Sequence, residues 1–170
     1  MCNKIINNEI NHLISNLNQH KISNTAVKDL THLKTFTIDD SQTIEIDDAI
    51  SLEKIFNQYK LWIHIASPTS HIQYQSAIDK KARNVISTVY LATNTFYMLP
   101  EILINNVFSL SDKDKRESIS LGVIFNEDGS VYSSEIVQSS IRVNYRLNYT
   151  EADELIDYAP KEEEDLSIIS

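Results

Sequence analysis

Acidic and large apolar residues are interleaved in residues 37–50, which read TIDDSQTIEIDDAI. Five carboxylates fall within ten residues of this stretch: Asp39, Asp40, Glu45, Asp47 and Asp48. A solvated acidic run lacks isoleucine between its charges, whereas here Ile38, Ile44 and Ile46 have to be buried. Burying them draws the acids into a confined space, in which like charges repel and raise one another's pKa. Any fold of this chain has to relieve that repulsion.

A divalent cation bound between the acids would relieve the repulsion. Mg²⁺ prefers oxygen ligands and is commonly held by a few carboxylates together with the phosphates of a substrate. The stretch therefore predicts a site for Mg²⁺ or Mn²⁺ that acts on a phosphate ester. The alternative is a strand and turn whose acidic face is solvated, as charged runs usually are. The spacing of the acids alone leaves both interpretations open.

The stretch also resembles the carboxylate motif that opens the catalytic (RNB) domain of the ribonuclease II and ribonuclease R exoribonucleases. That motif reads T-I-D, then five residues, then D-x-D-D-A. Asp39, Asp47 and Asp48 match three of its four acids, and Glu45 stands where most members have aspartate. The variant with E-I-D-D-A-I resembles the cyanobacterial and plastid branch of the family in particular.

The resemblance implies a reaction and a set of metal ligands. The reaction is Mg²⁺-dependent hydrolysis of single-stranded RNA from its 3′ end to nucleoside 5′-monophosphates, with Mn²⁺ as a possible substitute. Asp39 and Asp48 would then be direct metal ligands, and Glu45 a ligand either directly or through water. Asp47 would be the catalytic residue that orients the metal-bound water or a second ion. The glutamate side chain is one methylene longer than aspartate, so its equivalence is an expectation only.

Four further residues are candidate RNA contacts. Residues 87–101 resemble the family's S-x-Y-L-P and P-M-L-P-E pair, and on that resemblance Tyr90 would stack on a base near the 3′ end. An aromatic ring stacks on any base, which suits sequence-independent processing. Residues 141–149 resemble the family's I-R-S-x-x-R-L-T-Y segment, which makes Arg142 and Arg146 candidate phosphate contacts beside Arg83. The alternatives are a tyrosine packed in the core and arginines paired with local acids.

Composition limits how the chain can meet RNA and where it resides. The 15 lysines and arginines against 24 aspartates and glutamates give a net charge of -9, which excludes a general electrostatic grip on nucleic acid. The single cysteine, Cys2, cannot form an internal disulfide and favours a reducing compartment. No apolar stretch approaches the ~18–20 residues of a membrane helix, and the N-terminus is too polar for a signal peptide. With the resemblance, we expect the plastid stroma, or the cytoplasm if the protein is bacterial.

Hydrophobic periodicity predicts an α+β fold with a twisted, mainly antiparallel sheet and helices packed on it. Helices are expected over residues 4–18, 24–30, 72–91, 101–107 and 151–158, the last with Thr150 as its N-cap. Strands are expected over residues 50–53, 60–66, 115–125 and 131–147, with a hairpin turn at 126–130. The helix 72–91 should pack on the sheet. His64, inside an apolar strand, is expected to be a core residue rather than a ligand.

The predicted organisation is a helical N-terminal segment, residues 1–34, followed by a partial RNB domain, residues 35–170. By resemblance the chain covers only the first third to two-fifths of the family's catalytic domain. We therefore expect weak or no exonuclease activity from these residues alone. The alternative function is a non-catalytic fragment, or an RNA-binding or partner subunit that needs a separately encoded second half or a homo-oligomer. A further alternative is a cation-binding protein without a role on RNA.

Overall fold

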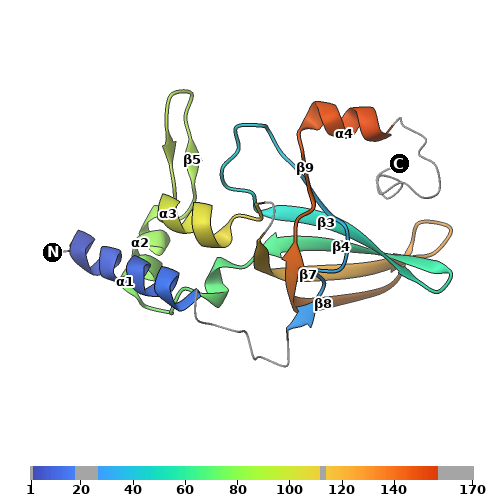
Figure 1. Ribbon diagram of the computed structural model, residues 1–170, viewed down its shortest axis with the longest axis horizontal. Coiled ribbons are helices and arrows are strands. Elements are labelled where there is room, and N and C mark those ends of the chain that lie inside the picture. The colour runs from blue at the N-terminus through green and yellow to red at the C-terminus, as the bar shows by residue number, and fades with distance from the viewer. Residues whose placement is uncertain (1, 18–26, 112–113, 157–170) are drawn as a thin grey trace. The chain divides into compact units, whose positions relative to one another are not determined.

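The computed structural model describes residues 2–17, 27–111 and 114–156 (Figure 1). The chain forms two compact units that are interleaved in sequence. The first unit comprises residues 1–24 and 67–108, and the second comprises residues 25–66 and 109–170. Whether residue 34 also separates two evolutionary domains stays a prediction. No helix in the described ranges is long and apolar enough to span a membrane.

The first unit is a small helical body. It contains α1 (Cys2–Leu17), the 3-10 turn η1 (Pro68–Ser70), α2 (Ala77–Val85), the hairpin β5 (Val89–Tyr90) and β6 (Thr95–Phe96), α3 (Glu101–Leu103) and the π-helical turn η2 (Ile104–Phe108). Its core consists of Ile6, Ile10, Ile78, Leu99, Leu103, Ile104, Val107 and Phe108. The Glu9 carboxylate of α1 accepts hydrogen bonds from the first backbone N–H groups of α2, at Ala77 (2.9 Å) and Ile78 (3.0 Å). One acid therefore caps α2 and ties the two helices together.

The helix predicted over residues 72–91 is too long, because its two ends carry local stop signals. Ser76 caps the helix, and its hydroxyl accepts from the N–H of Asp79 at 3.1 Å. Ile86 adopts a positive φ of 75° and ends it. Beyond Ile86 the chain turns into the β5–β6 hairpin, which projects from the helices of its unit (Figure 1). Whether α2 packs on the sheet stays a prediction.

The second unit is built on seven strands (Figure 1). They are β1 (Lys28–Asp29), β2 (Thr35–Ile38), β3 (Asp48–Ile55), β4 (Gln58–Ala66), β7 (Lys115–Phe125), β8 (Val131–Arg142) and β9 (Tyr145–Leu147). Their order in the sheet is β1-β8-β7-β4-β3-β2-β9, and only the β1/β8 and β2/β9 pairs are parallel. The predicted α+β class with a mainly antiparallel sheet is confirmed. The helix expected over residues 24–30 is wrong, because Lys28 and Asp29 form strand β1 and pair with β8. Residues 24–26 lie outside the described ranges.

The single long strand predicted over residues 131–147 is divided in two. β8 ends at Arg142, and the chain crosses to the other edge of the sheet, where β9 pairs with β2. Asn144 makes the crossing possible: its side-chain oxygen accepts from the Thr35 N–H (3.0 Å), and its own N–H donates to the Thr35 carbonyl (2.9 Å). Alternation of apolar residues continues across the break, so periodicity could not reveal it. The crossing places β9 beside the strand that leads into the acidic stretch.

The final described helix, α4 (Tyr149–Ile156), begins earlier than predicted. Its N-cap is Asn148, whose side-chain oxygen accepts from the Glu151 N–H at 3.0 Å, while the Glu151 carboxylate accepts from the Asn148 N–H at 2.8 Å. This reciprocal pair is a capping box, so the assignment of Thr150 as N-cap was wrong. The predicted end at residues 157–158 lies outside the described residues.

One face of the sheet carries the core of the second unit, and we call it the core face. The cluster comprises Leu30, Leu33, Ile46, Ala49, Trp62, Leu110, Ile141 and Val143. Beside it runs a chain of buried polar groups: Ser51 to His64 (2.8 Å), His64 to Ser120 (2.6 Å), and Ser120 to Ser139 (2.5 Å). His64 has an exposed fraction of 0%, which confirms it as a core residue. Its two ring nitrogens are both satisfied by hydroxyls of neighbouring strands.

The opposite side of the sheet, which we call the open face, is apolar but only partly covered. Its side chains alternate along the strands with those of the core face. Strand register sets Ile50, Ile63, Leu121 and Ile136 in one row across four strands. Ile136 has an exposed fraction of 73% and Ile65, beside this row, is also exposed. This unit therefore leaves an apolar sheet surface in contact with water.

Candidate functional site

The acids lie where two neighbouring strands begin and end. Asp39 directly follows β2 and Asp48 begins β3, and these strands are antiparallel neighbours through the pairs Thr35–Ser51 and Phe36–Ile50. Residues 39–48 join the two strands, with Asp48 as the first residue of β3, and we call them the acidic loop. Because the loop leaves one strand and returns on its neighbour, both ends lie at the same edge of the hairpin. The strand pairing thus sets the two ends of this acidic segment beside each other.

The pKa shifts of Asp47 and Asp39 show that Asp39, Glu45, Asp47 and Asp48 interact. The pKa of Asp47 is raised to about 6, first by withdrawal from water and then by the negative charges of Glu45, Asp48 and Asp39. The pKa of Asp39 is also raised, by burial and then by Asp48, and is partly restored by Arg146. Asp47 still has access to water, so solvent weakens these interactions. The repulsion inferred from the sequence is present in the folded unit.

The acidic loop is held at several points. An N–H of the Arg146 guanidinium (Nη2) donates to the Thr43 carbonyl at 2.6 Å and more weakly to the Ser41 carbonyl at 3.5 Å. The Asp39 N–H donates to the Leu147 carbonyl at 3.0 Å. Arg146 reaches the loop because β9 sets it opposite Thr37 on β2. Its guanidinium therefore provides positive charge beside Asp39 as well as two contacts to the loop backbone.

The far end of the loop is fixed by residues that the sequence reasoning missed. The Ala66 N–H at the end of β4 donates to the Asp47 carbonyl at 2.8 Å. Ser109, which directly follows η2, contacts the loop on either side of Glu45. Neither residue carries charge or a recognisable ligand pattern.

The donor chemistry of the acidic loop fits a hard cation. Asp39, Glu45, Asp47 and Asp48 offer oxygen ligands only, and their mutual repulsion is what a divalent ion would relieve. In the part of the chain that the structure describes, however, no three histidine, cysteine, aspartate or glutamate side chains stand close enough together to hold a metal ion as they are. An ion bound here would have one or two direct carboxylate ligands, with water and substrate phosphate completing its shell.

The candidate RNA contacts fall into both units. In the first, Tyr90 is exposed on the β5–β6 hairpin, and Arg83 is exposed on α2. The Arg83 Nε donates to the Asp79 carboxylate at 3.0 Å, and its guanidinium lies 5.2 Å from the Tyr74 ring centroid. In the second unit Arg142 is exposed at the end of β8, opposite Lys115. The positive charge of Arg146, also in the second unit, lowers the pKa of Asp39.

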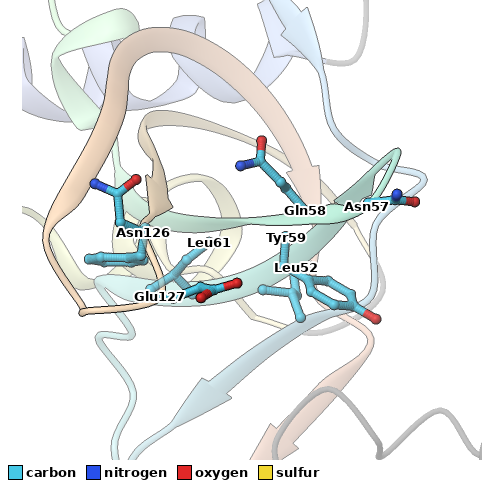
Figure 2. A pocket seen from close by; sticks show the side chains of 8 residues that line it. Leu52, Asn57, Gln58, Tyr59, Leu61, Asn126 and Glu127 are labelled. Carbon is cyan, nitrogen blue, oxygen red and sulfur yellow. The ribbon is translucent and has the colours of Figure 1, made fainter.

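A shallow hollow of about 440 Å³ lies elsewhere in the second unit (Figure 2). It is lined by Leu52, Asn57, Gln58, Tyr59, Leu61, Phe125, Asn126 and Glu127. These residues surround the turn that joins β3 to β4, whereas Asp48 begins β3 at the other end. Leu52 and Leu61 belong to the open face. The hollow is therefore an extension of that face and not part of the acidic site.

The RNB domain family matches residues 27–169. The chain belongs to this family. Ribonuclease II, chloroplastic/mitochondrial, of Arabidopsis thaliana is 35% identical over 111 residues, which are 65% of the chain and 14% of that relative. A ribonuclease of Synechocystis is 36% identical over 112 residues, 66% of the chain and 17% of the relative. The RNB chain thus spans less than a fifth of the length of these relatives, and its likeness to the cyanobacterial and plastid branch is confirmed.

Solved RNB structures share the fold. Mycoplasma genitalium RNase R in complex with ribose-methylated single-stranded RNA superposes with a TM-score of 0.75 at 22% identity, covering 92% of this chain and 26% of that one. Yeast Ssd1, described as a pseudonuclease, gives a TM-score of 0.73 at 20% identity, covering 87% of this chain and 18% of that one. The fold thus occurs in a nuclease and in a pseudonuclease. The fold alone therefore does not distinguish a nuclease from a pseudonuclease, and the residues of the site have to make the difference.

Proposed function

We propose that this RNB chain carries the metal-binding acids of a Mg²⁺-dependent 3′-to-5′ exoribonuclease, which hydrolyses single-stranded RNA to nucleoside 5′-monophosphates. Mn²⁺ would substitute for Mg²⁺. The observation that supports this function is the placement of four acids in one short segment of an RNB fold, where burial, and then the charges of Glu45, Asp48 and Asp39, raise the pKa of Asp47. Ile46 is buried as expected, whereas Ile44 is exposed, so the expectation that it is buried was wrong. The buried Ile46 and the interacting carboxylates distinguish this loop from a merely solvated acidic face.

The acids have different roles in this proposal. A bound divalent ion would neutralise charge on the scissile phosphate and lower the pKa of a bound water. Asp39 and Asp48, at the two ends of the acidic loop, would hold the ion, and Glu45 would hold it directly or through water. Asp47 would accept a hydrogen bond from the attacking water and so orient it. Its backbone carbonyl is already fixed by the Ala66 N–H.

RNA would be held by side chains rather than by a basic surface, as the net charge of -9 requires. Tyr90, exposed on its hairpin, would stack on a base. Arg83, Arg142 and Arg146 are exposed and would contact phosphates. A guanidinium has five N–H donors, so Arg146 can bind the acidic loop and a phosphate together. The alternative of a cation-binding protein without a role on RNA fails if Tyr90→Ala weakens RNA binding while the affinity for Mg²⁺ stays unchanged.

The reaction is tested with 5′-labelled single-stranded RNA, Mg²⁺ or EDTA, and Asp47→Asn as the matched variant. We expect shortening from the 3′ end that requires both Mg²⁺ and Asp47. The rate of hydrolysis by residues 1–170 alone should be roughly 10²–10⁴-fold lower than that of a full-length RNB enzyme. The loss of one group that stabilises charge in the transition state has an effect of this size. Shortening that persists in EDTA or in Asp47→Asn would contradict the proposal. No shortening at all would favour the second candidate function.

The second candidate is a partner subunit, and the open face favours it. A row of apolar side chains across four strands is left partly exposed within the second unit. Apolar faces of this kind are normally covered in a folded domain. The occupant we propose is the part of an RNB-domain polypeptide that the relatives carry outside the matched region, supplied by a second chain. The coverage of only 26% of the solved RNase R chain supports that choice.

Ile136→Lys tests the open face, because Ile136 is 73% exposed and its replacement should leave folding intact. The probe is the region of the Arabidopsis relative that follows its matched segment, purified separately and mixed with residues 1–170. Sedimentation velocity should show a complex that Ile136→Lys weakens at least tenfold. Ser133→Lys, exposed on the same strand but on the core-face side, is the matched control and should bind normally. Formation of a homodimer by residues 1–170 would contradict this choice of occupant. Equal weakening of the complex by Ile136→Lys and Ser133→Lys would contradict it as well.

We also propose the plastid stroma as the location, or the cytoplasm if the protein is bacterial. The support is the similarity to a chloroplastic/mitochondrial relative and to a Synechocystis relative. A fluorescent fusion of the full gene product that accumulates in another compartment would contradict it.

A further inference from the structure

Ser109 binds the acidic loop with a single hydroxyl that contacts both peptide groups flanking Glu45. Its Oγ donates to the Ile44 carbonyl at 2.9 Å and accepts from the Ile46 N–H at 3.1 Å. Ser109 has an exposed fraction of 2%, so water does not compete for these bonds. The hydroxyl therefore fixes the backbone on both sides of Glu45.

Ser109 is itself held firmly. The N–H of the next residue, Leu110, donates to the Ile46 carbonyl at 2.9 Å, and Leu110 and Ile46 are both buried in the core cluster. The Arg116 Nε donates to the Ser109 carbonyl at 3.0 Å, and the Arg116 side chain is largely buried. Residues 109–110 therefore run alongside residues 44–46 through three hydrogen bonds. This contact joins the segment that follows η2 to the acidic loop.

Glu45, which stands where most family members have aspartate, is the acid that depends most on such a support. Its side chain has one more rotatable bond than aspartate, so its carboxylate is fixed only if the backbone below it is fixed. After burial, the negative charge of Glu45 contributes most to the raised pKa of Asp47. We infer that Ser109 is a positioning residue, which holds Glu45 so that its carboxylate joins Asp39, Asp47 and Asp48 at the metal site. This inference rests on the proposed function.

The test measures the free protein and the metal separately. Ser109→Ala should speed hydrogen exchange of the Ile46 amide several-fold in EDTA, because the amide loses its acceptor. It should also weaken Mn²⁺ binding roughly tenfold, measured by electron paramagnetic resonance, as loss of a residue that orients a ligand does. Ser118→Ala is the matched control: Ser118 is a buried, hydrogen-bonded hydroxyl of β7 in the same unit. Ser118→Ala should change neither the exchange rate of the Ile46 amide nor the affinity for Mn²⁺.

Glu45→Gln shows whether Ser109 acts through Glu45. If it does, adding Ser109→Ala to Glu45→Gln should weaken Mn²⁺ binding little further, whereas independent effects would add. Additive effects, or unchanged Mn²⁺ binding in Ser109→Ala despite faster exchange, would overturn this inference and leave the proposed function standing. A wild-type protein that binds no Mn²⁺ would overturn both.

Discussion

Gly122→Ala is expected to lower the free energy of unfolding by about 2 kcal/mol, because the new methyl group has no space. A Cβ at this position would lie 2.7, 2.8 and 2.9 Å from three carbon atoms of the Trp62 ring, against which Gly122 packs across the β4–β7 pair. These carbon atoms belong to a rigid indole ring, which has no flexible end that could rotate away from the new methyl group. Alanine suits a strand better than glycine by roughly 0.5–1 kcal/mol, which offsets only part of the clash.

Trp62 cannot easily move aside. It is fully buried, and its Nε1–H donates to the Glu53 carboxylate at 2.8 Å. The ammonium groups of Lys28 and Lys60 lie 4.5 and 5.0 Å from its ring centroid, and both lysines pair with the Glu135 carboxylate. Moving the indole would break the hydrogen bond and both cation–π contacts. The strand pair would have to separate instead.

Urea unfolding of Gly122→Ala, Gly129→Ala and the wild type measures this effect. Gly129 has a φ of 81° and open space around it, so its alanine variant should lose about 1 kcal/mol through backbone strain alone. Trp62→Phe removes the outer ring, so Gly122→Ala should cost less in that background than in the wild type. Equal costs in both backgrounds would show that the indole contact is not the cause.

His64 is expected to make the protein lose stability in mild acid. Burial lowers its pKa from 6.5 to about 4, so the folded protein keeps the ring neutral while the unfolded chain protonates it. As the pH falls from 6.5 to 4, the unfolded state binds the extra proton, and the free energy of unfolding falls by about 1.4 kcal/mol per pH unit. The total is roughly 3 kcal/mol over that window. Below pH 4 the folded form protonates as well, and this contribution stops changing.

His64→Gln isolates the effect from other groups. Asp47, whose pKa is raised to about 6, contributes in the opposite direction over part of the same window, but it is present in both proteins. At pH 8 the variant should be less stable, because it cannot satisfy both Ser51 and Ser120. The difference between the two proteins should shrink by roughly 3 kcal/mol by pH 4. Ser118→Ala alters the same polar cluster without removing a titratable group, so its free energy of unfolding should differ from that of the wild type by the same amount at every pH. If the difference between His64→Gln and the wild type were also independent of pH, the account would be contradicted.

Local patterns predicted most strands correctly, because alternation and turn residues act over a few neighbours. The hairpin around Gly129 and the strands of residues 60–66 and 115–125 follow from such signals. The break at Asn144 was missed, since its cause is a pair of hydrogen bonds to Thr35, far away in sequence. The true ends of α2 depend on a cap at Ser76 and an unusual φ at Ile86, which apolar periodicity does not record.

The acids of the candidate site could be named from sequence, because charge between isoleucines is costly and therefore conspicuous. What holds them could not be named. Ser109 and Ala66 act through a hydroxyl and a backbone N–H, and neither feature distinguishes them from other residues of their type. Arg146 was expected at RNA phosphates, which stays a prediction, and its contact with the acidic loop became visible only with the strand order.

The most direct test of the account is the effect of Mn²⁺ on thermal unfolding of the wild type and Asp47→Asn. At a Mn²⁺ concentration 100 times the dissociation constant, binding should stabilise the wild type by about 2.7 kcal/mol. In EDTA, Asp47→Asn should be at least as stable as the wild type, because one repelling charge is gone, and it should gain little from Mn²⁺. A wild type that does not respond to Mn²⁺, or an Asp47→Asn variant that responds equally, would contradict the central claim that these acids form a divalent-cation site.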